Sequence, residues 1–294
     1  MSGPDALSIA AGLIVDVGLK STALLALGGL GALLLRGGSA AQRHAVWAGT
    51  FAALPLLGLA AAQRGPAIAL DAPWVAPLWL AGAVLAALPL LRGVVGLVRL
   101  RRAALPDPQE PGLLHSATVA GPVTWGLLRP VIVLPAAAAA WPAAQRAAAL
   151  AHEQAHVRRH DWAIHMAVWA ISALFWFNPL AWLARRALAQ EAEHAADDAA
   201  LAAGVRPSDY AGLLVSLTAS GRHAAGTAAA LGAGSSPLGR RVRAVLEARP
   251  RSPGRAWALG LALSLGGGAA SALGAWPAWT RPPDTLTCSP GPTP

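Results

Sequence analysis

Charged residues and cysteines are both scarce in this chain. Only 13% of its 294 residues are charged, 55% are hydrophobic and the mean hydropathy is +0.48, far from the composition of a typical soluble domain. Cys288 is the single cysteine, which excludes an intrachain disulfide framework and a cysteine-ligated zinc site. The first residues lack a basic stretch, so we expect no cleavable signal peptide. The composition instead predicts a mainly α-helical membrane protein.

About four segments have the length and apolarity to cross a bilayer, which takes about 20 helical residues. They lie at about residues 21–35, 46–62, 74–98 and 256–276. An earlier start of the first segment, at Ile9, would place Asp16 and Lys20 one helical turn apart, where they can pair. We therefore expect three spans near the N-terminus and a fourth after a long polar interval.

Arginines predict the orientation of these spans. They gather between the first two spans and at both ends of the polar interval, whereas the opposite side carries only Arg64 and Arg281. Because basic residues are enriched in cytoplasmic loops, we expect both termini outside and residues 99–255 in the cytoplasm. The formal charge of +9 then indicates topology and contact with anionic lipid. No basic patch is interleaved with aromatic residues, so direct binding of nucleic acid is not expected.

The expected cytoplasmic segment begins with short apolar runs and continues as helix. Runs at 117–120 and 131–134 are bracketed by glycine and proline and favour a small β-hairpin. An Ala-rich helical pattern then extends from Pro142 to about Arg159. The segment is therefore predicted to be mostly helical.

A second pair of helices is predicted downstream. The apolar stretch 162–177 ends at Asn178-Pro179, a strong helix breaker. A fifth span here would need a return span within 180–186, which is too short and contains two arginines. We therefore expect a helical hairpin packed against the spans or partly sunk in the bilayer surface. Its returning helix would bring residues near Glu193 to the level of His156.

The helix that begins near Pro142 carries the zinc-peptidase spacing H-E-x-x-H at residues 152–156. Residues four apart on a helix lie about 40° apart around its axis, so His152 and His156 can bind one metal ion from one face. Glu153 would lie beside the metal, where a carboxylate can take a proton from water. A polar helix face that fits this spacing by chance is the alternative.

A catalytic zinc site generally needs a third protein ligand and an open position for water. Arg159 and Trp162 occupy the positions where a metzincin would carry glycine and histidine, so that class is rejected. Glu193 is the favoured third ligand over Glu191 and His194, and Asp197, one turn further, can accept a hydrogen bond from a ligating imidazole. A solvated acidic helix face is the alternative interpretation.

Four ordered motifs surround these residues. They are Gly121–Pro135 (GPVTWGLLRPVIVLP), His152–His156 followed by Asp161, Trp176-Phe177-Asn178-Pro179-Leu180, and Glu193 with Asp197. Together they resemble the BlaR/MecR-type integral-membrane metallopeptidases, the antirepressor family, over about residues 20–250. The resemblance implies a mostly helical, gluzincin-like zinc-peptidase domain.

The resemblance also implies roles for single residues. Zn²⁺ would be held by His152, His156 and Glu193, with Glu153 as the general base and Asp161 and Asp197 supporting the ligands. For Asp161 a surface position is the alternative, because about 140° separates it from His156 on an ideal helix. His160 and His165 match no ligand position and are interpreted as interfacial or packing residues. Residues 124–129 would form an edge strand to which a peptide substrate could add.

The implied function is a zinc-dependent endopeptidase of a signalling system in the bacterial inner membrane. Its substrate would be a cytoplasmic protein, a winged-helix repressor by the resemblance, and the chain itself is a second candidate substrate through residues 221–239. A non-catalytic zinc-containing signal transducer and a housekeeping peptidase for membrane proteins are the alternatives. Association with a second copy of the chain stays open.

One feature of the antibiotic sensors in this family is not found here. They carry a penicillin-binding domain after the last span, whereas about 18 residues follow Trp276 and contain no S-x-x-K motif. We therefore expect no β-lactam sensing by this chain. The expected layout is a three-span region (1–102), a cytoplasmic peptidase domain (103–220), a flexible basic linker (221–255), a fourth span (256–276) and a short outer tail (277–294).

Overall fold

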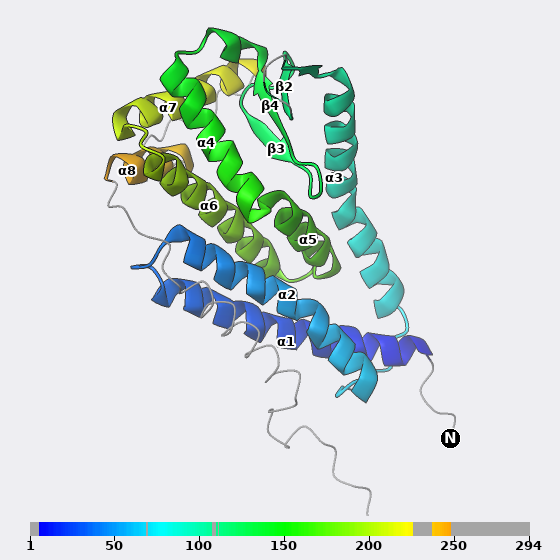
Figure 1. Cartoon of the computed structure of the whole chain (residues 1–294). Helices are drawn as coiled ribbons and strands as arrows, with labels where there is room; N and C mark the ends of the chain where they lie inside the picture. The colour runs from blue at the N-terminus through cyan, green and yellow to red at the C-terminus, as the bar shows by residue number, and fades with distance from the viewer. Residues whose placement is uncertain (1–5, 69, 108–109, 111, 226–236, 248–294) are drawn as a thin grey trace, which may run out of the picture.

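Three long apolar helices come first in the structure, a computed structural model that describes residues 6–68, 70–107, 110, 112–225 and 237–247. They are α1 (Ala6–Leu34), α2 (Ala40–Arg64) and α3 (Val75–Ala103), and each is long and apolar enough to cross a membrane. α1 and α2 run side by side, and α3 rises from them at a steep angle (Figure 1). They agree with the three predicted N-terminal spans. The fourth, 256–276, lies outside the described residues.

Local polar contacts shape the first two helices. Lys20 Nζ lies 2.7 Å from Asp16 Oδ2, so the pair predicted one turn apart on α1 is formed. α2 begins with a capping box, in which Ser39 accepts from the Gln42 amide and the Gln42 side chain accepts from the Ser39 amide. This reciprocal pair satisfies backbone donors that have no partner inside the helix.

A small sheet lies between α3 and the helices that follow it (Figure 1). Its strands are β1 (Leu105–Pro106), β2 (Leu113–Ser116), β3 (Val123–Trp125) and β4 (Val131–Pro135), in the order β1-β2-β4-β3. β2 runs parallel to β4, and β3 pairs antiparallel with it, which places β3 at the edge. Trp125 and Val133 on these strands pack against Leu97 and Leu100 of α3.

The predicted hairpin exists, but its first strand was assigned to the wrong residues. Residues 117–120 form a turn, and the strand that pairs with β4 is Val123–Trp125. The connection needs Gly126, whose φ is +106° and where a Cβ would lie 2.8 Å from the Arg129 carbonyl oxygen. The apolar content of 117–120 suggested a strand, whereas the β-branched and aromatic residues 123–125 form it.

Three helices form the centre of the fold. They are α4 (Ala143–Arg159), preceded by a short 3₁₀ helix (Ala136–Ala140), then α5 (Asp161–Leu174) and α6 (Pro179–Ala202). α5 and α6 form the predicted helical hairpin and pack against α1, α2 and α3. Asn178 caps α6 by accepting from the Leu180 amide, and its Nδ2 donates to Ser21 and Thr22 of α1 at 3.1 Å. The hairpin is therefore fixed to the first span at its tip.

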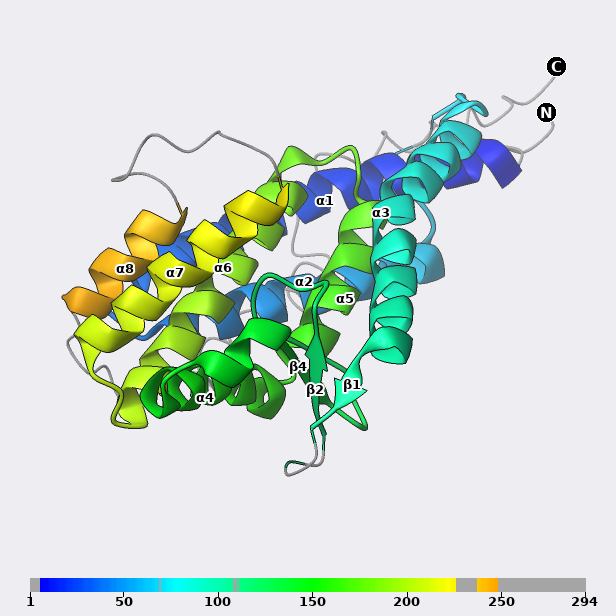
Figure 2. The same ribbon diagram turned by 90° about the horizontal axis from the view of Figure 1, so that it is seen from above.

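Two further helices, α7 (Pro207–Ala225) and α8 (Pro237–Leu246), lie beside α6 (Figure 2). α8 falls within the segment predicted as a flexible linker, and this part of the prediction is corrected. Val245 of α8 is 1% exposed and packs in one core with Tyr210 of α7 and Ala149 of α4. Residues 237–246 are therefore part of the helical body, and 226–236 lie outside the described residues.

Candidate metal centre

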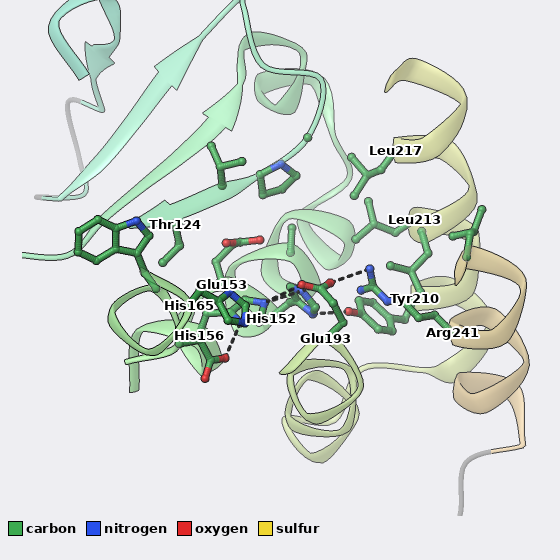
Figure 3. A pocket seen from close by; sticks show the side chains of 18 of the residues that line it. Thr124, His152, Glu153, His156, His165, Glu193, Tyr210, Leu213, Leu217 and Arg241 are labelled. Atoms are coloured by element: carbon green, nitrogen blue, oxygen red, sulfur yellow. Dashed lines mark hydrogen bonds and ion pairs between the residues drawn. The ribbon is translucent and has the colours of Figure 1, made fainter. Parts of the chain in front are cut away.

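Two imidazoles and one carboxylate converge where α4 crosses α6 (Figure 3). The Nε2 atoms of His152 and His156 lie 3.2 Å apart. Glu193 Oε2 lies 3.7 Å from His152 Nε2, and Oε1 lies 3.7 Å from His156 Nε2. Two atoms bound about 2.1 Å from one tetrahedral zinc ion would be about 3.4 Å apart. One ligand atom from each of the three residues lies within 4.8 Å of the others, so small side-chain adjustments would bring this donor set onto such an ion. The predicted ligand residues are thus brought together.

The α4–α5 junction holds His156 in place. His160 adopts the left-handed conformation (φ 55°), which ends α4 and starts α5 in a new direction. Asp161 is therefore not on the continuous helix that would put it 140° away, and its Oδ2 lies 2.7 Å from His156 Nδ1. Arg159 also bonds Asp161, and its Nη2 donates to the Ala192 carbonyl of α6 at 2.7 Å. The junction thus ties the second histidine to the helix of Glu193.

Charged groups at this junction shift the pKa values of both His156 and Asp161. Burial disfavours a charge on Asp161, but hydrogen bonds from His156 and Arg159 outweigh it and lower its pKa to about 2. Burial also disfavours a charge on His156, yet Asp161 and the nearby carboxylates of Glu193 and Glu153 raise its pKa. With Nδ1–H donated to Asp161, the Nε2 of a neutral His156 carries a free lone pair for a metal.

His152 has a different kind of support, from residues distant in sequence. Its Nδ1 lies 2.7 Å from the hydroxyl of Tyr210, which donates to Asp197 Oδ1 at 2.7 Å. Asp197 Oδ1 is also 3.3 Å from His152 Nδ1. Burial and the charge of Asp197 raise the pKa of Tyr210, so the hydroxyl stays protonated. The arrangement keeps the proton of His152 on Nδ1 and leaves Nε2 to face Glu193.

Arg241 of α8 completes this side of the centre. Its Nε and Nη2 donate to the two oxygens of Asp197 at 2.9 and 2.7 Å, and its Nη1 lies 2.8 Å from Glu193 Oε2. Burial disfavours a charge on Asp197, but the hydrogen bonds from Arg241 and His152 hold its pKa well below the usual range. One guanidinium therefore joins a candidate ligand to the carboxylate beside His152.

Glu153 lines the same pocket as the three candidate ligands and is 7% exposed. Thr124 of the edge strand β3 faces the pocket on one side, and Leu213 and Leu217 of α7 line another (Figure 3). The pocket thus brings a buried carboxylate and the edge strand of the sheet to the converging ligand atoms.

Residues 74–245 match the sequence profile of the family described as BlaR1 peptidase M56. The chain belongs to this family. Regulatory protein BlaR1 of Bacillus licheniformis is 33% identical over 89 residues, which cover 30% of this chain and 15% of that protein. The chain therefore aligns with a small part of that relative. Membership of the BlaR1 peptidase M56 family confirms the resemblance seen in the ordered motifs.

Within the BlaR1 peptidase M56 region, the structure places the other histidines and carboxylates that the sequence offered as possible metal ligands. Glu191 faces away from the cluster and forms two hydrogen bonds of 2.8 Å with Arg43 of α2. His194 is not among the converging residues. His160 is exposed at the junction, and His165 lines the pocket without joining the ligand cluster.

Two residues of the centre were missed by sequence reasoning. Tyr210 is the single tyrosine of the chain, a signal that could have been noticed. Arg241 is one of many arginines and lay in a segment predicted to be a linker, so nothing local marked it. Both reach the centre through the packing of α7 and α8 on α4 and α6.

Proposed function

We propose that this membrane protein is a zinc-dependent endopeptidase of a signalling system. The observation that carries the proposal is the convergence of His152, His156 and Glu193 in one pocket with Glu153. A zinc ion held by the three ligands would polarise a water molecule and the carbonyl of a peptide bond. Membership of the BlaR1 peptidase M56 family supports this chemistry, and zinc is the metal that the donor set favours.

The chain's own residues supply the proton transfers and the alignment. Glu153 takes a proton from the attacking water and passes it to the amine that leaves when the C–N bond breaks. Asp161 and Tyr210 hold the Nδ1 protons of His156 and His152, so that both Nε2 atoms stay free. An extended substrate would pair with the edge strand β3 and lie across the pocket beside Thr124.

We further propose that the substrate is a cytoplasmic protein, with a transcriptional repressor of the winged-helix class as the leading candidate and the chain itself as the second. The name of the relative, Regulatory protein BlaR1, favours a regulatory role over housekeeping. The arginines at the end of α3, Arg101 and Arg102, support a cytoplasmic site. Alkaline phosphatase fused after Arg102 should be inactive, and an active fusion would reverse the proposed topology.

Co-expression with a candidate winged-helix repressor, the proposed regulator substrate, tests the activity. Wild-type protein should deplete the full-length regulator, and Glu153→Gln should preserve it while retaining zinc. Gln154→Ala, an exposed neighbour on the same helix, is the matched control and should cleave normally. Cleavage by Glu153→Gln at the wild-type rate would reject the proposed chemistry and leave a zinc-containing signal transducer as the interpretation.

A further inference from the structure

Arg241 stands in an unusual position for a cation, because it contacts a candidate ligand of a metal cation. Its Nη1 lies 2.8 Å from Glu193 Oε2, the oxygen that faces His152 Nε2 at 3.7 Å (Figure 3). A positive charge there repels a bound divalent ion and so gives no obvious gain in metal affinity. Its presence calls for a role in the geometry of the ligand.

The two oxygens of Glu193 have different surroundings. Oε2 is held by Arg241, whereas Oε1 faces His156 Nε2 at 3.7 Å. A carboxylate that binds zinc through both oxygens fills a position that a catalytic site keeps open for water. Because Oε2 is already engaged in an ion pair of 2.8 Å with Arg241, binding through Oε1 alone is favoured.

We propose that Arg241 is a positioning residue that keeps Glu193 a one-oxygen ligand and so preserves the open position for water. This inference rests on the proposed zinc-peptidase function. It gives α8, which lies within the predicted linker, a role at the candidate metal centre.

The guanidinium is itself rigidly held. Its Nε and Nη2 form a fork on Asp197, which is 3% exposed. With two nitrogens of a planar group fixed in this way, the direction of the third toward Glu193 is also fixed. Leu238, Val242 and Val245 on the same helix pack into the core around Tyr210 and anchor the backbone.

Lysine cannot reproduce this arrangement. Its ammonium is a point charge that lacks the planar fork, so it retains the charge and loses the directed contact to Oε2. Arg241→Lys therefore separates geometry from charge, and Arg241→Gln removes both. Arg243→Gln is the matched control, because it removes one exposed arginine from the same helix.

The test uses full-length protein in detergent, loaded with Co²⁺ for visible absorption and with Zn²⁺ for affinity by competition with a chelating indicator. Four-coordinate Co²⁺ absorbs visible light much more strongly than five-coordinate Co²⁺. The band intensity therefore reports whether Glu193 binds the ion through one oxygen or through two. We expect intense bands for wild type and Arg243→Gln, and bands at least twofold weaker for Arg241→Lys and Arg241→Gln. Zinc affinity of Arg241→Lys should stay within threefold of wild type or become tighter.

The outcomes separate this inference from the proposed function. Wild-type protein that binds neither ion overturns both. Intense bands in both Arg241 variants, with intact folding by circular dichroism, overturn the positioning role and leave the zinc site standing. A loss of zinc affinity of tenfold or more in Arg241→Lys, with unchanged band intensity, also overturns it, because Arg241 would then support the fold of the site alone.

Discussion

The two histidines of the candidate centre are supported in contrasting ways. His156 is held by Asp161, five residues further along the chain, through a sharp turn between two helices. His152 is held by Tyr210, Asp197 and Arg241, which come from three other helices. The first arrangement forms from local sequence, whereas the second exists only once α7 and α8 have packed on α4 and α6. One ligand therefore depends on a turn and the other on the tertiary fold.

The largest effect on cleavage is expected at Glu153, which supports neither His156 nor His152. Glu153→Gln should slow cleavage by about 10²–10⁴-fold, because the proton acceptor is lost while the shape of the side chain is kept. Zinc stoichiometry, measured by elemental analysis of purified protein, should not change. A matching loss of zinc would show that Glu153 supports the ligands and would remove the distinction between base and ligand.

Zinc affinity should depend more strongly on the local support of His156 than on the long-range support of His152. Asp161→Asn should weaken zinc binding by about 10–100-fold, because His156 loses its charged acceptor and Arg159 loses its partner. Competition with a chelating indicator measures the affinity. Asp198→Asn, an exposed carboxylate of α6, serves as the control for loss of one acidic charge. Equal affinities of Asp161→Asn and wild type would contradict the support assigned to the junction.

The long-range side should tolerate the loss of one group. Tyr210→Phe removes the hydroxyl between His152 and Asp197, but Asp197 Oδ1 already lies 3.3 Å from His152 Nδ1 and can accept its proton directly. We expect zinc affinity to fall by less than about tenfold, below the loss for Asp161→Asn. A larger loss of zinc affinity in Tyr210→Phe than in Asp161→Asn, measured in the same competition assay, would show that the long-range support of His152 matters more than the local support of His156.

The smallest effect is expected at Glu191, the alternative ligand that sequence left open. Glu191→Gln should leave zinc stoichiometry unchanged, because this side chain is paired with Arg43 and faces away from the histidines. Glu193→Gln, two residues away, should lose zinc. Elemental analysis of both proteins in parallel decides the assignment, and zinc loss from Glu191→Gln alone would transfer the ligand role to it.

The sequence predicted the features that depend on local helix geometry better than those that depend on long-range contacts. Helical spacing placed His152 and His156 on one face, and the length of the α5–α6 hairpin brought Glu193 back to them. The left-handed turn at His160 was not predicted, because a positive φ is uncommon for any residue other than glycine. The prediction assumed an ideal continuous helix, and this misplaced Asp161.

Non-local pairing was the second limit. The parallel contact of β2 with β4 joins residues that no local pattern relates. The residue pattern placed the partner strand of β4 at 117–120, whereas the family resemblance pointed to an edge strand at 124–129, of which the structure forms only the start, in Val123–Trp125. Arg241 lies at the site because Leu238 and Val245 of the same helix pack in the core. These are tertiary contacts, and the alanine- and glycine-rich sequence nearby gave no local sign of them.

Helix α6 has one more consequence. Its N-cap residue, Asn178, is hydrogen-bonded to Ser21 and Thr22 of α1, and the helix carries Glu193 about 22 Å further along. The two histidines sit on a different helix, α4. A continuous helix transmits a displacement along its length, so a tilt or rotation of α1 at Ser21 would reach Glu193 through α6 and, through the bond of Arg159 to the Ala192 carbonyl, the α4–α5 junction. The candidate ligands are thereby physically connected to the orientation of an apolar helix long enough to cross the membrane.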